Sequence, residues 1–246
     1  MPQVLNISGY QFTHVADPAA LRDVLHEAAE AGALRGTVLL AHEGVNLFLA
    51  GAEAAIDAFL AVLRAQPGLD GFEAKRSWSH ETPFRRLRVK VKREIIRMNQ
   101  RAIAPQAGRA PALDARTLRR WLEQGHDDHG RPVVTLDTRN AFEVDHGSFE
   151  GSIDWRLGKF SDFPAALQAR KGELEGKAVV SFCTGGIRCE KAALYMREAG
   201  LEHVWQLEGG ILKYFEEAGG AHFRGDCFVF DERIALDASL AVAGND

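Results

Sequence analysis

AVVSFCTGGIRCEKAALYMREA, residues 178–199, is the stretch that decides the fold of this chain. It opens with an apolar, β-branched run at 178–182, which predicts a buried strand. Apolar residues then recur at helical spacing from Ala192 to Ala199, and Gly200 predicts the end of a helix that begins at Arg188. A turn that starts with Cys183 and contains two glycines joins the two elements.

A turn of this composition can direct several backbone N–H groups toward one point, with a helix N-terminus behind it. A thiol at that point ionises easily, because the N–H dipoles and the charge of Arg188 stabilise its thiolate. The sequence therefore predicts a nucleophilic sulfur or a bound anion at Cys183. The competing interpretation is a buried, inert cysteine, which would not require the Thr-Gly-Gly-Ile-Arg that follows it.

The strand, turn and helix, followed by VWQLEGGI at 204–211, resemble the rhodanese domain. The longer string CTGGIRCEKA resembles the rhodanese-containing tRNA uridine hydroxylases, as do HEGVN at 42–46, PFRRL at 83–87 and CFVFDER at 227–233. That family makes 5-hydroxyuridine at the wobble position in an oxygen-dependent reaction. The resemblance implies that Cys183 is catalytic and forms a persulfide, that the tRNA anticodon arm is the partner, and that molecular oxygen is a co-substrate.

The active-site loop implied by this resemblance follows Cys183 and consists of Thr184, Gly185, Gly186, Ile187, Arg188 and Cys189. Four residues separate Cys183 from Arg188, one fewer than in cysteine phosphatases, so the ring resembles a sulfurtransferase loop. We expect Arg188 to hold negative charge. Cys189 is either a resolving thiol or a small packed residue, and Cys227 is expected to be structural.

Asp137 and Arg139 end another predicted strand, Val133–Asp137, and are expected to brace the neighbouring loops. His42–Asn46 predicts a hairpin turn, and the resemblance implies a substrate-side role for Glu43 and Asn46. Leu47 and Phe48 follow where the family usually has a small or polar residue, which leaves the detailed role of this turn open.

The composition is that of a soluble globular protein with room for two domains: 246 residues, 46% hydrophobic and 26% charged. We expect no membrane segment and no secretory signal. Three cysteines favour a reducing compartment, and the expected location is the cytoplasm. There is no Cys-x-x-Cys pair, and His126-Asp127-Asp128 lies in a glycine-flanked loop, so no metal site and no cofactor are expected.

The order of predicted elements is strand, helix, strand, strand, helix, strand, and then strands that alternate with helices. This order predicts an α/β protein in which a ferredoxin-like (acylphosphatase-like) domain over residues 1–98 precedes a rhodanese-like domain with a central parallel sheet. Residues 99–113 contain Pro105, Gly108 and Pro111 and are predicted to form a linker. The rhodanese-like domain is then expected over 114–223, followed by a C-terminal segment, 224–246, that lacks the cysteine-rich tail often found in the family.

Positive charge is concentrated in one segment of an otherwise acidic chain. Residues 75–109 carry a net charge of +9, within a total of −4, so the rest of the chain sums to −13. Residues 84–96 are predicted to form a long strand or a strand pair. Within this segment Arg86, Arg88, Lys90 and Lys92 alternate with aliphatic residues, so on a strand they share one face, about 7 Å apart. The predicted RNA-binding residues are Arg85, Arg86, Arg88, Lys90, Lys92, Arg93 and Arg97. A solvated charged face is the alternative.

The residue chemistry predicts a reactive thiol beside an RNA-binding face, and the resemblance implies a tRNA wobble-uridine hydroxylase; no DNA partner is expected. Two rival functions stay open. A sulfurtransferase that passes persulfide sulfur to a small acceptor or protein would need Cys183 but not the basic strand. A non-catalytic RNA-binding module with a vestigial rhodanese fold would need the strand but not Cys183. The identity of the tRNA, the electron donor and the oligomeric state are not encoded in any recognisable pattern.

Overall fold

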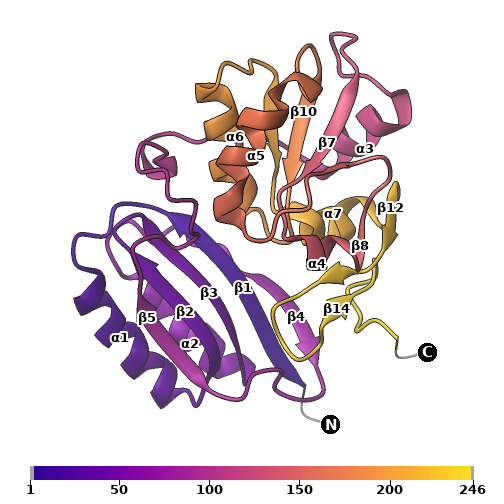
Figure 1. Cartoon of the computed structure of the whole chain (residues 1–246). Coiled ribbons are helices and arrows are strands. Elements are labelled where there is room, and N and C mark those ends of the chain that lie inside the picture. The colour runs from indigo at the N-terminus through magenta and orange to yellow at the C-terminus, as the bar shows by residue number, and fades with distance from the viewer. Residues whose placement is uncertain (1–2, 245–246) are drawn as a thin grey trace. The chain divides into compact units, whose positions relative to one another are not determined.

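The computed structural model describes residues 3–244, which form two compact units, one ending at Arg97 and the next beginning at Met98. In the first unit, helices α1 and α2 accompany five strands (Figure 1). Their bounds are β1 (Val4–Phe12), α1 (Pro18–Ala31), β2 (Arg35–Ala41), β3 (Gly44–Gly51), α2 (Glu53–Arg64), β4 (Lys75–Ser79) and β5 (Leu87–Val91).

The first sheet has the strand order β4-β1-β3-β2-β5, with β5 parallel to β2 and the other neighbours antiparallel. Its core is aliphatic and aromatic, and includes Leu25 of α1, Leu40 of β2 and Phe59 of α2. Asp17 caps α1 by accepting hydrogen bonds from the N–H groups of Ala19 and Ala20. The predicted acylphosphatase-like fold is confirmed.

Two details of this unit differ from the prediction. The fourth strand of the ferredoxin-like order is β4, a polar edge strand without apolar alternation, whereas the basic strand is a fifth one at the opposite edge. The basic strand is also shorter than 84–96: it comprises Leu87–Val91, so Arg86 and Lys92 flank it. Leu87 and Val89 pack against the core, whereas Val91, the last residue of β5, is 42% exposed.

The predicted turn at 42–46 is tighter in the structure, because β3 already begins at Gly44. Gly44 has a φ of 142°, and a Cβ there would lie 2.0 Å from the carbonyl oxygen of Gln11. Only glycine fits between β2 and β1 at this point. Asn46 consequently lies within β3, opposite Tyr10 and Leu39, and not in a loop.

The second unit contains helices on a parallel sheet with several short additional strands (Figure 1). Its strands are β6 (Ala112–Leu113), β7 (Val133–Asp137), β8 (Gly147–Phe149), β9 (Ile153–Asp154), β10 (Ala178–Phe182), β11 (Val204–Leu207), β12 (Phe223–Gly225), β13 (Cys227–Phe228) and β14 (Ala235–Leu236). Its helices are α3 (Ala115–Gln124), α4 (Ala141–Val144), α5 (Phe163–Arg170), α6 (Ile187–Glu198) and α7 (Gly210–Ala218), with short 3-10 turns η1 (Pro105–Ala107), η2 (Phe160–Asp162) and η3 (Lys171–Glu173).

The main sheet of this unit has the order β6-β11-β10-β7-β9, and each neighbouring pair is parallel. This confirms the predicted rhodanese-like sheet. Helix α3 packs with α7 and α5 with α6 (Figure 1). The side chains of β10 are all buried, so Cys183 follows the most enclosed strand of the sheet, at its carboxyl end.

Two segments set apart in the sequence analysis join this unit. Ala112–Leu113, the last residues of the predicted linker, form β6 and pair with β11, which two residues could not reveal by periodicity. Beyond residue 223, Cys227 is buried in the same core cluster as Phe182 and Tyr214. Among the described helices, none has the length and apolar character needed to cross a membrane.

Candidate active site

The Cys183 loop is closed around its own sulfur. Cys183 is fully buried, and its Sγ accepts a hydrogen bond from the backbone N–H of Gly186 at 3.2 Å. Gly186 has a φ of 105°, a conformation that glycine adopts without strain. The chain can therefore fold back over the sulfur and enter α6 at the next residue.

The second pair of glycines, Gly209 and Gly210 of VWQLEGGI, lies at the start of α7, whose first turn holds the Cys183 loop by hydrogen bonds. The N–H groups of Ile211 and Leu212, in the first turn of α7, donate to the carbonyl oxygens of Cys183 at 2.9 Å and Thr184 at 3.2 Å. Gly210 has a φ of 68°, and a Cβ there would lie 2.4 Å from the Cys183 carbonyl oxygen. Any side chain at residue 210 would displace the loop.

The two cysteines of the loop are in contact. Cys189 Sγ lies 3.8 Å from Cys183 Sγ and 2.9 Å from the carbonyl oxygen of Gly186, and these two acceptors share its single S–H. Burial by itself would raise the pKa of Cys183, but the hydrogen bond with Cys189, the charge of Arg188 and backbone N–H groups lower it well below its ordinary value. Burial and the neighbouring Cys183 raise the pKa of Cys189, so this thiol keeps its proton.

Cys227 differs from both. It is buried, and its Sγ contacts the carbonyl oxygen of Phe228 at 3.8 Å. Burial raises its pKa to about 12, so it remains a thiol. The three cysteines thus divide into one ionisable sulfur, one protonated neighbour and one member of the hydrophobic core.

Arg188 has a partner that the sequence did not reveal. Its guanidinium donates to both carboxylate oxygens of Glu143, at 2.6 and 2.7 Å, with 6% and 0% of the two side chains exposed. The same carboxylate accepts from the N–H of Asn140 at 3.0 Å and the hydroxyl of Thr184 at 3.5 Å. Arg188 was expected to hold charge within the loop, and the charge that it contacts directly is Glu143. The spacing Asn140-x-x-Glu143, typical of a helix start, was the only sequence signal.

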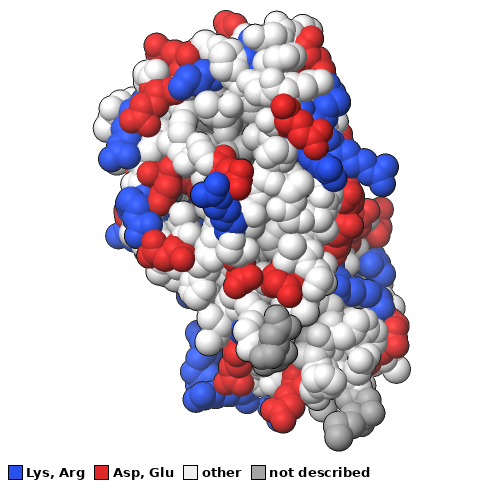
Figure 2. Space-filling model, turned by 90° about the vertical axis from the view of Figure 1, so that its right-hand side faces the viewer, with Lys and Arg blue, Asp and Glu red and all other residues white. Residues whose placement is uncertain are grey.

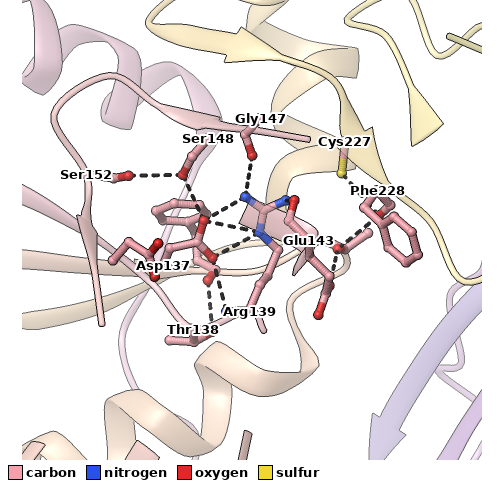
Figure 3. A network of polar contacts seen from close by, with 12 residues as sticks. Asp137, Thr138, Arg139, Glu143, Gly147, Ser148, Ser152, Cys227 and Phe228 are labelled. Carbon is pink, nitrogen blue, oxygen red and sulfur yellow. Dashed lines mark hydrogen bonds and ion pairs between the residues drawn. The ribbon is translucent and has the colours of Figure 1, made fainter. Parts of the chain in front are cut away.

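Asp137 and Arg139 form a second buried ion pair, at 2.6 Å, with neither side chain exposed (Figure 3). Ser148 also donates to Asp137, and Arg139 donates to the carbonyl oxygen of Gly147 at 2.6 Å. Between them in sequence, Thr138 donates its hydroxyl to the carbonyl oxygen of Phe182 at 2.8 Å, one residue before Cys183. The network thereby ties the end of β7 to the end of β10.

Three phenylalanines adjoin the loop. The ring of Phe142 contacts those of Phe228 and Phe230, with centroids 5.2 and 6.4 Å apart, and the rings of Phe228 and Phe230 are 5.2 Å apart. Phe142 and Phe230 are 47% and 50% exposed. The Arg188 guanidinium lies 5.8 Å from the centroid of the Phe230 ring, and Thr184 donates to the carbonyl oxygen of Phe228. We call Phe142, Phe228 and Phe230 the aromatic cluster; the sequence analysis did not identify it as a site feature.

Glu43 and Asn46 meet at one peptide segment of the first unit. Glu43 Oε1 accepts from the N–H of Ile95 at 2.7 Å, and the Asn46 amide donates to the carbonyl oxygen of Ile95 at 3.3 Å. Asn46 is buried and Glu43 is partly so. Both side chains therefore fix the chain just after the basic strand, and their substrate-side role remains a prediction.

The predicted RNA-binding residues are all exposed: Arg85, Arg86, Arg88, Lys90, Lys92, Arg93 and Arg97. Within residues 3–244, no carboxylate forms an ion pair with Arg88 or Lys90. On the face shown in Figure 2, by contrast, acidic and basic side chains are interspersed.

The His126–Asp128 segment has other partners. Asp127 is buried and accepts hydrogen bonds from the N–H groups of His129 and Arg131, while Asp128 is paired with Arg120. In the part of the chain that the structure describes, no group of three His, Cys, Asp or Glu side chains is arranged to hold a metal ion.

Comparison with known proteins gives matches over both units. The UPF0176 acylphosphatase like domain matches residues 4–95, and the rhodanese-like domain matches residues 108–217. The tRNA uridine(34) hydroxylase of Bordetella petrii is 66% identical over 99% of this chain and 97% of its own. That of Variovorax paradoxus is 60% identical over 100% and 94%. Among solved structures, the rhodanese-like domain from Anabaena sp. is 23% identical over 55% of this chain and 87% of its own, with a TM-score of 0.39.

Proposed function

Because this chain belongs to the tRNA uridine(34) hydroxylase family, we propose that it hydroxylates uridine 34 of tRNA and that Cys183 acts at that base. The reaction is the oxygen-dependent conversion of the wobble uridine to 5-hydroxyuridine. The observation that carries the role of Cys183 is a buried sulfur whose pKa is lowered well below its ordinary value, inside a loop that two glycine-dependent turns hold in place. Such a thiolate is a nucleophile at neutral pH.

The anticodon arm is bound through its phosphates by the basic strand. Arg88 and Lys90 project from β5 at an exposed sheet edge, and Glu43 and Asn46 fix the chain that follows it. Lysine and arginine contacts to phosphate fix the position of a nucleic acid without reading its sequence. The basic strand therefore supplies affinity, and recognition of uridine falls to the second unit.

The aromatic cluster receives the base. An anticodon base is single-stranded and can stack on an aromatic ring. Phe142 and Phe230 present about half of their surfaces, and Phe230 is held beside Arg188 at the edge of the Cys183 loop. A base stacked on Phe230 would lie next to the loop that carries the thiolate.

The expected cytoplasmic location remains a prediction.

The proposal is tested in a strain that lacks this protein, complemented with variants, by nucleoside analysis of tRNA for 5-hydroxyuridine. Cys183→Ala should abolish the product while tRNA affinity is retained. Arg88→Ala/Lys90→Ala should lower the product because the substrate is held poorly. Cys227→Ala is the matched control and should complement. Normal complementation by Cys183→Ala would instead favour an RNA-binding module with a vestigial rhodanese fold.

Incubation with thiosulfate separates the hydroxylase from a sulfurtransferase. A persulfide is predicted on Cys183, and the Arg88→Ala/Lys90→Ala chain should form it as readily as the wild type because its loop is intact. A sulfurtransferase would form this persulfide too, but the 5-hydroxyuridine content of tRNA would then be the same in the deletion strain as in its parent. Persulfide on Cys189 or Cys227 alone would contradict the assignment of Cys183.

A further inference from the structure

We infer that Cys183 and Cys189 act as a dithiol pair that supplies two electrons to the hydroxylation and becomes a disulfide in each turnover. This inference rests on the proposed function, since it assigns the reductant of that reaction. It gives Cys189 a chemical role. Neither the packing of this residue in α6 nor the hydroxylase activity of the family implies such a role by itself.

The first argument is proximity. The two sulfurs are 3.8 Å apart, in van der Waals contact, whereas a disulfide bond is about 2.05 Å long. Cys183 begins the loop that follows β10, and Cys189 lies in the first turn of α6, so the sulfurs belong to two elements joined by a short glycine-containing turn. To form the bond, Cys189 would have to give up its hydrogen bond to the Gly186 carbonyl oxygen.

The second argument is the difference between the two thiols. Cys183 is held as a thiolate and Cys189 as a thiol, for the physical reasons given above. A low-pKa sulfur next to a protonated one is the arrangement of a reactive cysteine with its resolving partner. Cys227 does not share it, because burial raises its pKa and no other cysteine sulfur is recorded in contact with it among the described residues.

The third argument is electron balance. Reduction of dioxygen to a hydroxyl group and a water molecule takes four electrons, of which the C5–H bond of uridine provides two. Uridine, dioxygen, the Cys183 thiolate, the Cys189 thiol and one proton from solvent give 5-hydroxyuridine, water and one disulfide. The C5–H, O–O and Cys189 S–H bonds break, while the C5–O bond, the S–S bond and the O–H bonds of the products form. One oxygen atom becomes the hydroxyl group and the other leaves as water. A small dithiol then reduces the disulfide by thiol exchange and restores both cysteines.

The experiment is a single turnover without added reductant. The full chain is reduced, freed of reductant in the absence of oxygen, and mixed with tRNA from the deletion strain and then with oxygenated buffer. We expect at most one 5-hydroxyuridine per chain, the disappearance of two thiols for each product, and a peptide in which Cys183 and Cys189 are linked. Added dithiothreitol should allow further turnovers.

Variants make the assignment specific. Cys189→Ala should give no product in the reductant-free turnover, whereas Cys227→Ala should match the wild type in product and in thiols consumed. Circular dichroism and tRNA binding establish that each variant is folded, and the thiol count in the wild-type chain needs no variant.

The inference is overturned if the wild-type chain forms product without consuming thiols, or if folded Cys189→Ala forms as much product as the wild type without reductant. In either case, the proposed function remains supported if hydroxylation still requires Cys183. The proposed function itself fails if the wild-type chain makes no 5-hydroxyuridine with or without dithiothreitol.

Discussion

Glu143 and Arg188 form a buried, bidentate ion pair at the N-terminus of α6, in which the guanidinium donates to both carboxylate oxygens. Glu143 comes from α4 and Arg188 from the first turn of α6, directly after the Cys183 turn, so the pair joins the start of α6 to the segment that follows β7. The N–H of Asn140 also donates to the carboxylate, and the Thr184 hydroxyl, which is shared with the Phe228 carbonyl oxygen, lies 3.5 Å from it. A buried charge pair of this kind persists only when its hydrogen bonds are satisfied.

Removal of the negative partner should therefore destabilise the second unit. Glu143→Gln leaves the Arg188 charge buried and without its carboxylate, which typically costs about 3–5 kcal/mol of unfolding free energy. Chemical denaturation measures the change. Glu123→Gln, which disrupts an exposed pair with Arg119, is the matched control and should leave the unfolding midpoint nearly unchanged. Equal effects of the two substitutions would mean that the buried pair has no special role in stability.

The state of the Cys183 thiol can be read from alkylation by iodoacetamide as a function of pH. The midpoint should lie well below about 8.5, the ordinary value for a cysteine. Cys189→Ala removes the hydrogen bond that lowers the pKa of Cys183, so it should move the midpoint to higher pH, while Cys227→Ala should not. A midpoint in the ordinary range for the wild type would contradict the ionised state of Cys183.

The same lowered pKa predicts a pH dependence of stability. Between the folded-state pKa of Cys183 and the unfolded value of about 8.5, the unfolded chain binds more protons than the folded one. The unfolding free energy of the wild type, relative to Cys183→Ala, should therefore rise with pH across this window and be fully present above it. This contribution should disappear as pH falls through the folded-state pKa. A constant difference across the window would show that both states have the same thiol pKa.

The basic strand should bind tRNA through phosphates. Arg88→Ala/Lys90→Ala should weaken the binding of all tRNAs to a similar degree. It should also reduce the slope of log affinity against log salt concentration by about one for each phosphate that is no longer neutralised. Arg119→Ala/Arg120→Ala removes the same charge from α3 and is the control, because those arginines are paired with Glu123 and Asp128. If both double variants changed the slope equally, the effect would be one of net charge and not of this strand.

The aromatic cluster should act in the hydroxylation through base stacking. Phe230→Ala is expected to lower kcat/KM for tRNA by an amount equivalent to about 1–3 kcal/mol, the typical value of one stacked base. Phe230→Tyr keeps the ring and should retain the activity. Because Phe230 is half exposed, stability should change little, and thermal unfolding checks this. Equal activity of the alanine and tyrosine variants would exclude stacking on this ring.

Local pattern in the sequence determined the elements that surround the site. β10 and β7 have the bounds expected from their apolar runs, and α3 begins after Asp114, which accepts a hydrogen bond from the N–H of Thr117. These features depend on side-chain periodicity and on caps within a few residues, which the sequence states directly. The position of Cys183 at the carboxyl end of a buried parallel strand follows from the same information.

The tertiary structure decided which side chains meet. Glu143 and Arg188 are 45 residues apart in sequence, and nothing in the local pattern links them. The position of the basic strand as a fifth strand beside β2 depended on β4, a polar strand without a periodic signal. Glu43 and Asn46 lay close together in sequence, but their common partner, the peptide of Ile95, is about fifty residues away.

Cys183 and Cys189 show the difference between what the sequence predicts and what only the tertiary structure decides. The spacing of Cys183 and Cys189 left both a resolving thiol and a packed residue open, because six residues across a turn of unknown shape do not fix the distance between two sulfurs. The left-handed conformation of Gly186 and the start of α6 at Ile187 set that distance at 3.8 Å. The sequence by itself predicted a reactive sulfur at the head of this loop, since that prediction depends on residue types in order. Only folding, which fixes backbone angles through contacts with α7 and α4, determined what that sulfur touches.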